Sequence, residues 1–198
     1  EVASEFRYRT IAPIKRSLFV TLSQSGETAD TLAAMRLAKK MDYLSTLAIC
    51  NVPGSTMMRE ADLSFLTRAG IEIGVASTKA FLTQLTALFL LALTLRRTRA
   101  NDAELETELV KQLEHLPVLI QKVLQQDKAI ANWAKAFTNK EHAIFIGRGM
   151  LYPIALEGAL KMKEISYIHA EGYPSGELKH GPLALVDTNM PVITTIPG

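Results

Sequence analysis

The feature that most constrains the fold is the alternation of short, strongly apolar runs with longer segments of helical periodicity. Residues 17–22 (SLFVTL) contain no charge and are rich in aromatic and β-branched side chains, which is typical of a strand buried on both faces. Residues 27–40 then place apolar and charged side chains in a helical pattern. Because this order recurs along the chain, it predicts an α/β fold with parallel sheets flanked by helices.

Further strands are expected at residues 43–50 (YLSTLAIC) and 61–67 (ADLSFLT), with a turn at 51–55 around Pro53 and Gly54. A long apolar helix should follow, ending near Arg97, with Ser77 or Thr78 as its N-cap. Later in the chain, the patterns predict a strand at 142–149, a helix at about 152–165, a loop, and a last strand at 191–196.

Residues 101–139 have a different pattern, that of an amphipathic helix with charged residues on its outer face. Pro117 is expected to break this helix once. We interpret the segment as a helical connector between two α/β domains. The predicted domains are therefore residues 1–100 and 140–198, with the connector at 101–139.

Composition excludes several classes of protein. The 198 residues are 48% hydrophobic and 21% charged, as in globular proteins with a core, and a net charge of +2 gives no reason to expect nucleic-acid binding. Cys50 is the single cysteine, so no internal disulfide can form and a reducing cytoplasm is expected. Since Cys50 ends an apolar run, a buried structural role is favoured over that of a nucleophile.

The uncharged run at residues 80–95 is shorter than the roughly 20 residues of a membrane span, and it contains three threonines and a glutamine. It suits a buried core helix or an interface helix. No metal-ligand spacing and no signal peptide are visible. The chain begins with Glu1 rather than Met and ends in a strand-like run, so we expect a segment of a longer protein, cut at both ends.

A cluster of hydrogen-bonding residues directly follows the first predicted strand, in residues 21–28 (TLSQSGET). Backbone N–H groups at the start of the next helix, with the hydroxyls of Ser23, Ser25 and Thr28, could hold an anion such as a sugar phosphate. Gly26 would let the backbone approach that ligand closely. The lack of a neighbouring lysine argues against a nucleotide P-loop. An ordinary helix cap at Ser25, with Glu27 satisfying the helix dipole, explains the same residues equally well.

A charged stripe lies on the predicted helix at 152–165. At 100° per residue, Glu157, Lys161 and Glu164 fall within an arc of about 60°, while most of the remaining circumference is apolar. We therefore expect a largely buried helix whose charges face partners or a wet cavity. Glu164, with Lys161 to manage charge on oxygen, could move a proton between neighbouring carbons of an open-chain sugar. Surface salt bridges are the alternative explanation.

His180 lies in a loop-like stretch (ELKHGPLAL) that ends in Gly181 and Pro182. An imidazole in such a loop could open a sugar ring by proton transfer. The other histidines, at positions 115, 142 and 169, have no comparable setting and are interpreted as structural.

The segments TLSQSGETADTL, LAICNVPGS, GIEIGVASTKAF and IGRGMLYPIALEGALKMKEISYIHAEGYPSGELKHGPLAL, in this order, resemble the isomerase part of bacterial glucosamine-6-phosphate synthases. That family makes glucosamine 6-phosphate from fructose 6-phosphate, with ammonia that a separate glutaminase domain releases from glutamine. Its isomerase part is built from two flavodoxin-like sugar-isomerase (SIS) domains. The resemblance covers almost the whole chain and implies a cytoplasmic homodimeric enzyme without a cofactor.

The resemblance also implies roles for individual residues. Glu164 would be the base that moves the proton between C1 and C2, with Lys161 assisting, and His180 would open the ring from the neighbouring subunit. Apart from the resemblance, the place of Glu157 on the same charged stripe suggests a supporting role for it. The phosphate and sugar would be held by Ser23, Gln24, Ser25, Thr28, Ser77 and Val75. The resemblance thus favours an anion-binding role for residues 21–28 over an ordinary helix cap.

Several parts of the family's pattern are not found in these 198 residues: the glutaminase domain, the first strand of the first SIS domain, and the C-terminal tail whose lysine forms a Schiff base with the sugar. We therefore expect no turnover from the chain alone. Two alternatives remain, a non-catalytic SIS module that binds phosphosugars and a stand-alone deglycase or isomerase of SIS type. A binding module would have no need to keep Glu164, Lys161 and His180 together.

Overall fold

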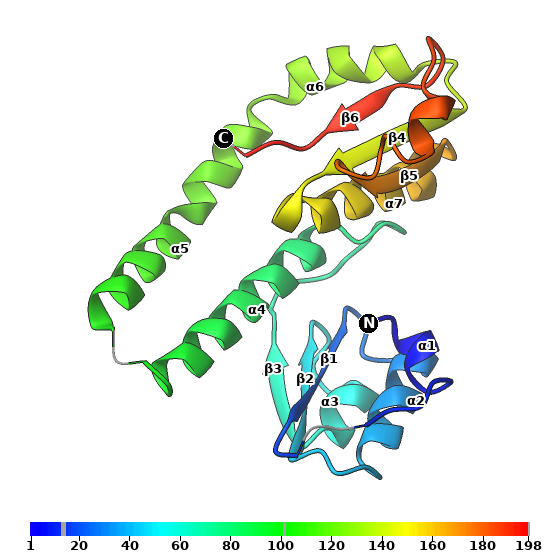
Figure 1. Ribbon diagram of the computed structural model, residues 1–198. Helices are drawn as coiled ribbons and strands as arrows, with labels where there is room; N and C mark the ends of the chain where they lie inside the picture. Colours follow the sequence, from blue (N-terminus) through cyan, green and yellow to red (C-terminus); the bar gives the residue numbers. More distant parts are fainter. Residues whose placement is uncertain (13–14, 101, 198) are drawn as a thin grey trace. The chain divides into compact units, whose positions relative to one another are not determined.

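A computed structural model describes residues 1–12, 15–100 and 102–197 and is drawn in Figure 1. The chain forms two compact units, one from Glu1 to Glu106 and the other from Thr107 onward. Each unit is built on a three-stranded parallel sheet. The predicted α/β class with parallel sheets and flanking helices is therefore confirmed.

The sheet of the first unit has the strand order β1-β2-β3. Its strands are β1 (Leu18–Ser23), β2 (Ser45–Cys50) and β3 (Leu63–Leu66), close to the three predicted runs. Ser23 pairs with Cys50 in the register, so the polar loop after β1 and the turn after β2 leave the sheet side by side at its carboxyl edge.

Helices α1 (Ala3–Phe6), α2 (Ala29–Ala38) and α3 (Thr56–Glu60) belong to the same unit. A buried core joins α2 and α3 to the sheet through Leu32, Met35, Ala48 and Met57. Cys50 is fully buried, as predicted. The sequence did not predict α1 or α3, because helices this short contain too few residues to show a period.

The long apolar helix α4 (Lys79–Arg97) has its N-cap at Thr78, one of the two predicted positions. Only Ala80 and Ala87 are buried. Five of the larger side chains are exposed, Leu82, Leu85, Phe89, Leu90 and Leu95, and the other leucines and Phe81 are half-buried. The expectation of a buried core helix is therefore wrong for the described chain, and the interface alternative stays a prediction. By length and composition α4 could also cross a membrane, but a single helix of this kind is weak evidence for a membrane span.

Helix α5 (Ala103–Leu124) is followed by α6 (Asp127–Ala134) and the 3₁₀ turn η1 (Lys135–Phe137). The expected break at Pro117 is wrong, since α5 runs through this residue and ends seven residues later. Every side chain of α5 is at least partly exposed, so water can satisfy the carbonyl group that lacks a partner opposite the proline. The boundaries 1–100, 101–139 and 140–198 stay a prediction.

The sheet of the second unit contains β4 (His142–Gly147), β5 (His169–Pro174) and β6 (Val192–Thr194) in the order β5-β4-β6. Between β4 and β5 lie η2 (Gly149–Leu151) and α7 (Tyr152–Ser166), and η3 (Pro182–Leu185) precedes β6. This order matches strands 2-1-3 of a flavodoxin-like sheet, and the consecutive order of the first unit is compatible with its strands 3-4-5.

Strands β4 and β6 and helix α7 confirm the predicted elements, whereas β5 occupies a stretch that was predicted as loop. The glutamate, glycine and proline of HAEGYP are poor strand formers. Pairing with β4 along all six residues outweighs this low propensity. Alanines at 143, 155, 159 and 170, with Phe145, form the core between α7 and the sheet.

Candidate functional site

The loop between β1 and α2 is held in a tight conformation by Gly26. This residue has a φ of +68°, in the left-handed region that favours glycine. A Cβ atom at this position would lie 2.2 Å from Ser55 Oγ and 2.7 Å from Cys50 Sγ. The loop is therefore packed directly onto the end of β2 and the start of α3.

The hydroxyl groups of this loop accept backbone hydrogen bonds. Gly26 N–H donates to Ser23 Oγ at 2.9 Å, and Glu27 N–H donates to Ser25 Oγ at 3.2 Å. Each hydroxyl therefore still has a proton to donate. Ser23 is buried, Ser25 and Gln24 are half-buried, and Thr28 is exposed.

The helix-cap interpretation of Ser25 is wrong. Helix α2 begins at Ala29, so Ser25 lies three residues before the N-cap, Thr28, and bonds within the loop instead. Thr28 itself makes no side-chain capping hydrogen bond. The first turn of α2 is thus not capped by a side-chain hydroxyl of the loop, and this end of a helix favours anions.

Glu27 does not interact with the dipole of α2, contrary to the second part of the cap interpretation. Its Oε1 accepts a hydrogen bond from Thr56 N–H at 2.7 Å, at the start of α3. The hydrogen bonds from the Thr56 backbone and side chain hold the pKa of Glu27 below its usual value. In α2 the first-turn acid is Asp30, which pairs with Arg7 at 2.7 Å.

A hollow of about 620 Å³ opens at the carboxyl edge of the first sheet. Its lining includes Gln24, Asn51 and Glu72. Ligands of open α/β sheets bind at this edge, outside the carboxyl ends of the strands. Of the predicted phosphate and sugar ligands, Gln24 is the one that lines this hollow.

Two residues that the sequence analysis did not single out hold the loops around this hollow. Asn51 Nδ2 donates to Gly70 O at 2.7 Å, and Asn51 Oδ1 accepts from Ala69 N–H at 2.7 Å. Glu72 accepts from Ala80 N–H at 3.1 Å, and so supplies the capping hydrogen bond that the side chain of the N-cap residue Thr78 does not make. The sequence signals that could have identified them are the position of Asn51 directly after a predicted strand and that of the acidic Glu72 shortly before the long apolar helix.

Val75 and Ser77 lie in the segment between β3 and α4 that Glu72 holds. Val75 is 98% exposed, while Ser77 is half-buried. Neither residue lines the hollow at the carboxyl edge. The structure therefore places both near the start of α4 and outside the lining of this hollow.

The second unit carries the charged stripe on α7, and its three members are in contact. Lys161 Nζ lies 2.5 Å from Glu164 Oε2 and 3.6 Å from Glu157 Oε1. The side chains are 20–32% exposed, so the ammonium group is half-buried between two carboxylates. The predicted grouping on one face is confirmed.

The expectation that α7 is buried over most of its circumference is wrong for the described chain. Only Ala155 and Ala159 are buried, whereas Leu156, Leu160 and Ile165 are exposed. The two alanines face the sheet, and their small side chains let the helix pack closely against β4 and β5. Leu156 still lies close to Gly172 of β5, and the partly buried Met162 packs against the same core.

His180 lies in the turn that follows β5, where its backbone N–H donates to Glu177 O at 2.9 Å. The residue is exposed. Within the described part of the second unit, no hydrogen bond or ion pair joins the side chain of His180 to Lys161 or Glu164. The structure does not bring these three candidates together.

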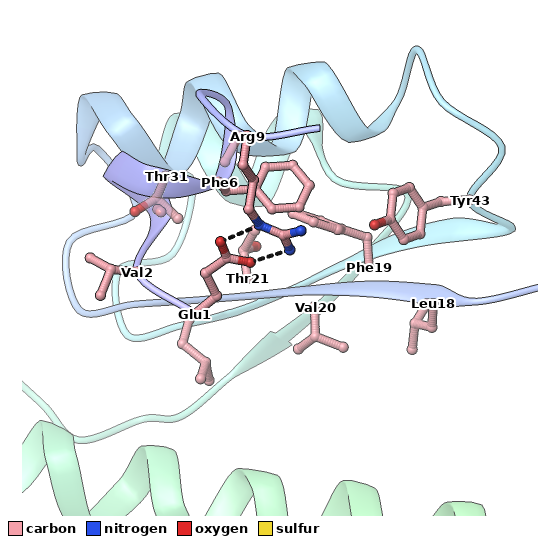
Figure 2. Close-up of a pocket in the computed structure, with 13 residues that line it drawn as sticks. Glu1, Val2, Phe6, Arg9, Leu18, Phe19, Val20, Thr21, Thr31 and Tyr43 are labelled. Carbon is pink, nitrogen blue, oxygen red and sulfur yellow. Dashed lines mark hydrogen bonds and ion pairs between the residues drawn. The ribbon is translucent and has the colours of Figure 1, made fainter. Parts of the chain in front are cut away.

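A further hollow, of about 590 Å³, lies beside β1 and is shown in Figure 2. Arg9 pairs with Glu1 there through two hydrogen bonds of 2.5 Å, and Phe19 lies between Phe6 and Tyr43. None of the predicted site residues lines it. Across residues 1–12, 15–100 and 102–197, no three His, Cys, Asp or Glu side chains converge as metal ligands.

Comparison with known proteins places these features in context. The SIS domain family matches residues 1–94 and 136–197 of the chain. The chain is 60% identical over 197 residues to the glutamine–fructose-6-phosphate aminotransferase (isomerizing) of Pectobacterium atrosepticum, and 61% identical to that of Escherichia coli (strain K12). Each alignment covers 100% of this chain and 32% of the relative, so the chain spans about a third of the length of these curated relatives.

Solved structures give a consistent result. The C-terminal domain of glucosamine-fructose-6-phosphate aminotransferase from Francisella tularensis superposes with a TM-score of 0.97 at 53% identity, covering 100% of this chain and 56% of that one. Glucosamine-6-phosphate deaminase from Thermotoga maritima superposes with a TM-score of 0.73 at 27% identity, covering 97% of this chain and 56% of that one.

Proposed function

Because the chain belongs to the SIS domain family, we propose that it is the sugar-phosphate isomerase part of an enzyme that makes glucosamine 6-phosphate from fructose 6-phosphate and glutamine-derived ammonia. The identity of 60% to aminotransferases of that name, over the whole chain, supports this assignment. The observation that carries the chemistry is the contact of Lys161 with both Glu164 and Glu157 on a half-buried face of α7.

Glu164 is the proposed base for proton transfer between C1 and C2 of the open-chain sugar. The ammonium group of its neighbour Lys161 lies 2.5 Å from the carboxylate and can stabilise negative charge that develops on the sugar oxygen. Glu157 shares the same ammonium group and so fixes the position of Lys161. A carboxylate held in this way is ready to accept a proton without reorganisation.

The phosphate group of the sugar is assigned to the loop that ends β1. Ser23, Gln24, Ser25 and Thr28 supply neutral donors there, at the N-terminal end of α2. Ser77 and Val75, in the segment before α4, are the proposed contacts to the sugar. Thr28 is exposed and Ser25 is only half-buried, so both can be reached from solvent, which is consistent with this role.

His180 is proposed to open the sugar ring from the neighbouring subunit of a homodimer. Its exposure in a turn, with no contact to Lys161 or Glu164 in the described residues, is compatible with action in trans. The whole protein would be cytoplasmic, would pair this part with a glutaminase domain, and would need no cofactor. The 198 residues alone are expected to bind the sugar phosphate without turning it over.

Two other functions make different demands on the same residues. A non-catalytic phosphosugar-binding module needs the loop at 23–28 but not the Glu157–Lys161–Glu164 contacts, which the structure shows to be formed. A stand-alone deglycase or isomerase is favoured by the fold similarity to glucosamine-6-phosphate deaminase, although the identity in that comparison is only 27%. The first proposal therefore has the stronger support.

A calorimetric titration of the 198-residue chain tests the substrate class. Fructose 6-phosphate should bind with a single-site isotherm, while fructose without the phosphate should show no heat of binding at the same concentrations. Equal affinity for the two sugars would contradict a phosphate site in the loop at 23–28. Absence of binding by either would contradict the proposal for this chain.

A further inference from the structure

Two histidines lie side by side on adjacent strands of the second sheet. His142 and His169 are the first residues of the parallel strands β4 and β5 and are paired in the register. Their Nδ1 atoms lie 3.4 Å apart, and the two rings are perpendicular. Both side chains point to the face of the sheet opposite the core that α7 covers, because that core is built from the alternate positions 143, 145 and 170.

The separation of the two nitrogens matches the edge of a tetrahedral metal site. Two imidazole nitrogens bound to Zn²⁺ at roughly 2.05 Å, with a tetrahedral angle between them, are about 3.3 Å apart. Two neighbouring parallel strands thus already present two ligands at the spacing that the ion requires. Imidazole is a good ligand for zinc, copper and nickel, whereas magnesium and calcium prefer oxygen.

The residues that follow on β5 support the second ring nitrogen of His169. Glu171, two positions further on the same face, places Oε1 3.5 Å from His169 Nε2. Tyr173, two positions further again, donates its hydroxyl to Glu171 Oε2. A carboxylate beside the remote nitrogen of a ligating histidine is the usual outer support of zinc sites, because it fixes the ring and its tautomer.

This arrangement also defines where the protons lie. Glu171 favours a proton on Nε2 of His169, which leaves the lone pair of its Nδ1 to accept from His142 Nδ1–H. When an ion binds both Nδ1 atoms, His142 moves its proton to Nε2 through solvent, and both rings stay neutral. The hydrogen bond is thereby replaced by the metal, with no net loss of protons.

The hollow around the pair is large enough for the ion and its waters. It measures about 260 Å³ and is lined by both histidines, Glu171, Tyr173, Leu185 and Met190. A water molecule occupies about 30 Å³, so two waters can complete a four-coordinate ion. Water would have to supply the other two ligands, because no group of three His, Cys, Asp or Glu side chains converges among the described residues.

We propose that His142 and His169 bind a divalent zinc ion through their Nδ1 atoms, with Glu171 as a positioning residue for His169. The ion would tie together the amino ends of β4 and β5 and so brace the β4–α7–β5 crossover. The carboxyl ends of these strands, Gly147 and Pro174, lie a full strand length away, about 16–20 Å. The proposal is independent of the proposed function, and zinc should leave fructose 6-phosphate affinity unchanged.

Zinc titration of the metal-free full chain, after dialysis against a chelator, tests the site. We expect one Zn²⁺ per chain, a rise in the thermal midpoint, and no binding of Mg²⁺. His142→Gln and His169→Gln should each abolish binding, and Glu171→Gln should weaken it roughly 10- to 100-fold. His115→Gln is the matched control, because His115 is exposed on α5 and should not contribute.

Imidazole ¹⁵N spectra of the wild-type chain provide a readout that does not depend on the variants folding. Zinc should move the Nδ1 resonances of two histidines, while Nε2 of His169 keeps its proton and Nε2 of His142 gains one. Three results would overturn the proposal: no binding with millimolar zinc, an affinity that His142→Gln leaves unchanged, or metal shifts confined to His115 and His180. In each case the pair is a histidine–histidine hydrogen bond only.

Discussion

Replacement of Gly26 by alanine tests how tightly the loop after β1 is packed. The new methyl group adds two costs. A non-glycine residue at a φ of +68° loses roughly 1–2 kcal/mol relative to an ordinary conformation. The methyl group would also overlap Ser55 Oγ at 2.2 Å and Cys50 Sγ at 2.7 Å, and such overpacking costs about 1–3 kcal/mol. Since Ser55 and Cys50 are buried, neither atom can move into solvent.

Gly54→Ala is the matched control, because Gly54 has nearly the same φ of +70° but nothing within 4 Å of the position of its Cβ. Urea unfolding should show a loss of about 2–5 kcal/mol for Gly26→Ala and only about 1–2 kcal/mol for Gly54→Ala. The difference between these two losses in free energy of unfolding is the steric cost of the methyl group at position 26. If both variants lose the same free energy of unfolding, the loop is not packed against Ser55 and Cys50, and the geometry described for the phosphate site is wrong.

Three further substitutions test other parts of the structure. Thr28→Val should weaken fructose 6-phosphate binding by roughly 1–2 kcal/mol in a calorimetric titration, and unchanged affinity would mean that this hydroxyl is not a phosphate ligand. Glu164→Gln, made in the whole protein, should leave that affinity nearly intact but abolish exchange of the sugar C1 and C2 protons with solvent; exchange at the wild-type rate would exclude Glu164 as the base. Hydrogen bonds from Lys39 and from Thr46 hold the pKa of Asp62 well below its usual value, so its contribution to stability is present above about pH 4 and is lost as the pH falls through the lowered pKa. Asp62→Asn should therefore lower the urea midpoint at pH 7. The midpoint of the variant should also decrease less between pH 4 and pH 2 than that of the wild type, and an equal decrease in the two proteins would contradict this.

The elements that the sequence predicted well are those whose pattern is local. The runs that became β1, β2 and β4 are apolar because both faces of a parallel strand are covered, and this property is visible in the residues themselves. Strand β5 is different, since its residues gain their conformation from pairing with β4, 27 positions away. Pro117 shows the opposite case, in which a strong local signal for a break is overridden in an exposed helix.

The same distinction applies to the candidate site. The grouping of Glu157, Lys161 and Glu164 follows from the helical repeat alone, and it is observed as predicted. The contact of Glu27 with Thr56 joins residues 29 positions apart and reverses the role that the sequence suggested for this acid. The contact between His142 and His169 could not be anticipated either, because it depends on β5 being a strand.

The charges around the loop at 23–28 lead to a last prediction, on how salt affects binding. Glu27 is bound to the start of α3, and Asp30 is neutralised by Arg7, so a phosphate in this loop meets hydroxyls, backbone N–H groups and the partial charge of a helix end. Salt screens interactions between full charges far more than hydrogen bonds to neutral donors. Fructose 6-phosphate affinity should therefore change by no more than about twofold between 0.05 and 0.5 M salt, a difference of roughly 0.4 kcal/mol. A loss of tenfold or more would mean that a cation binds the phosphate. Arg68 would then be the first residue to test, since it lines the same hollow as Gln24. Arg7 would be the second, because a single exposed ion pair holds it near the start of α2 and it could leave Asp30 for the ligand.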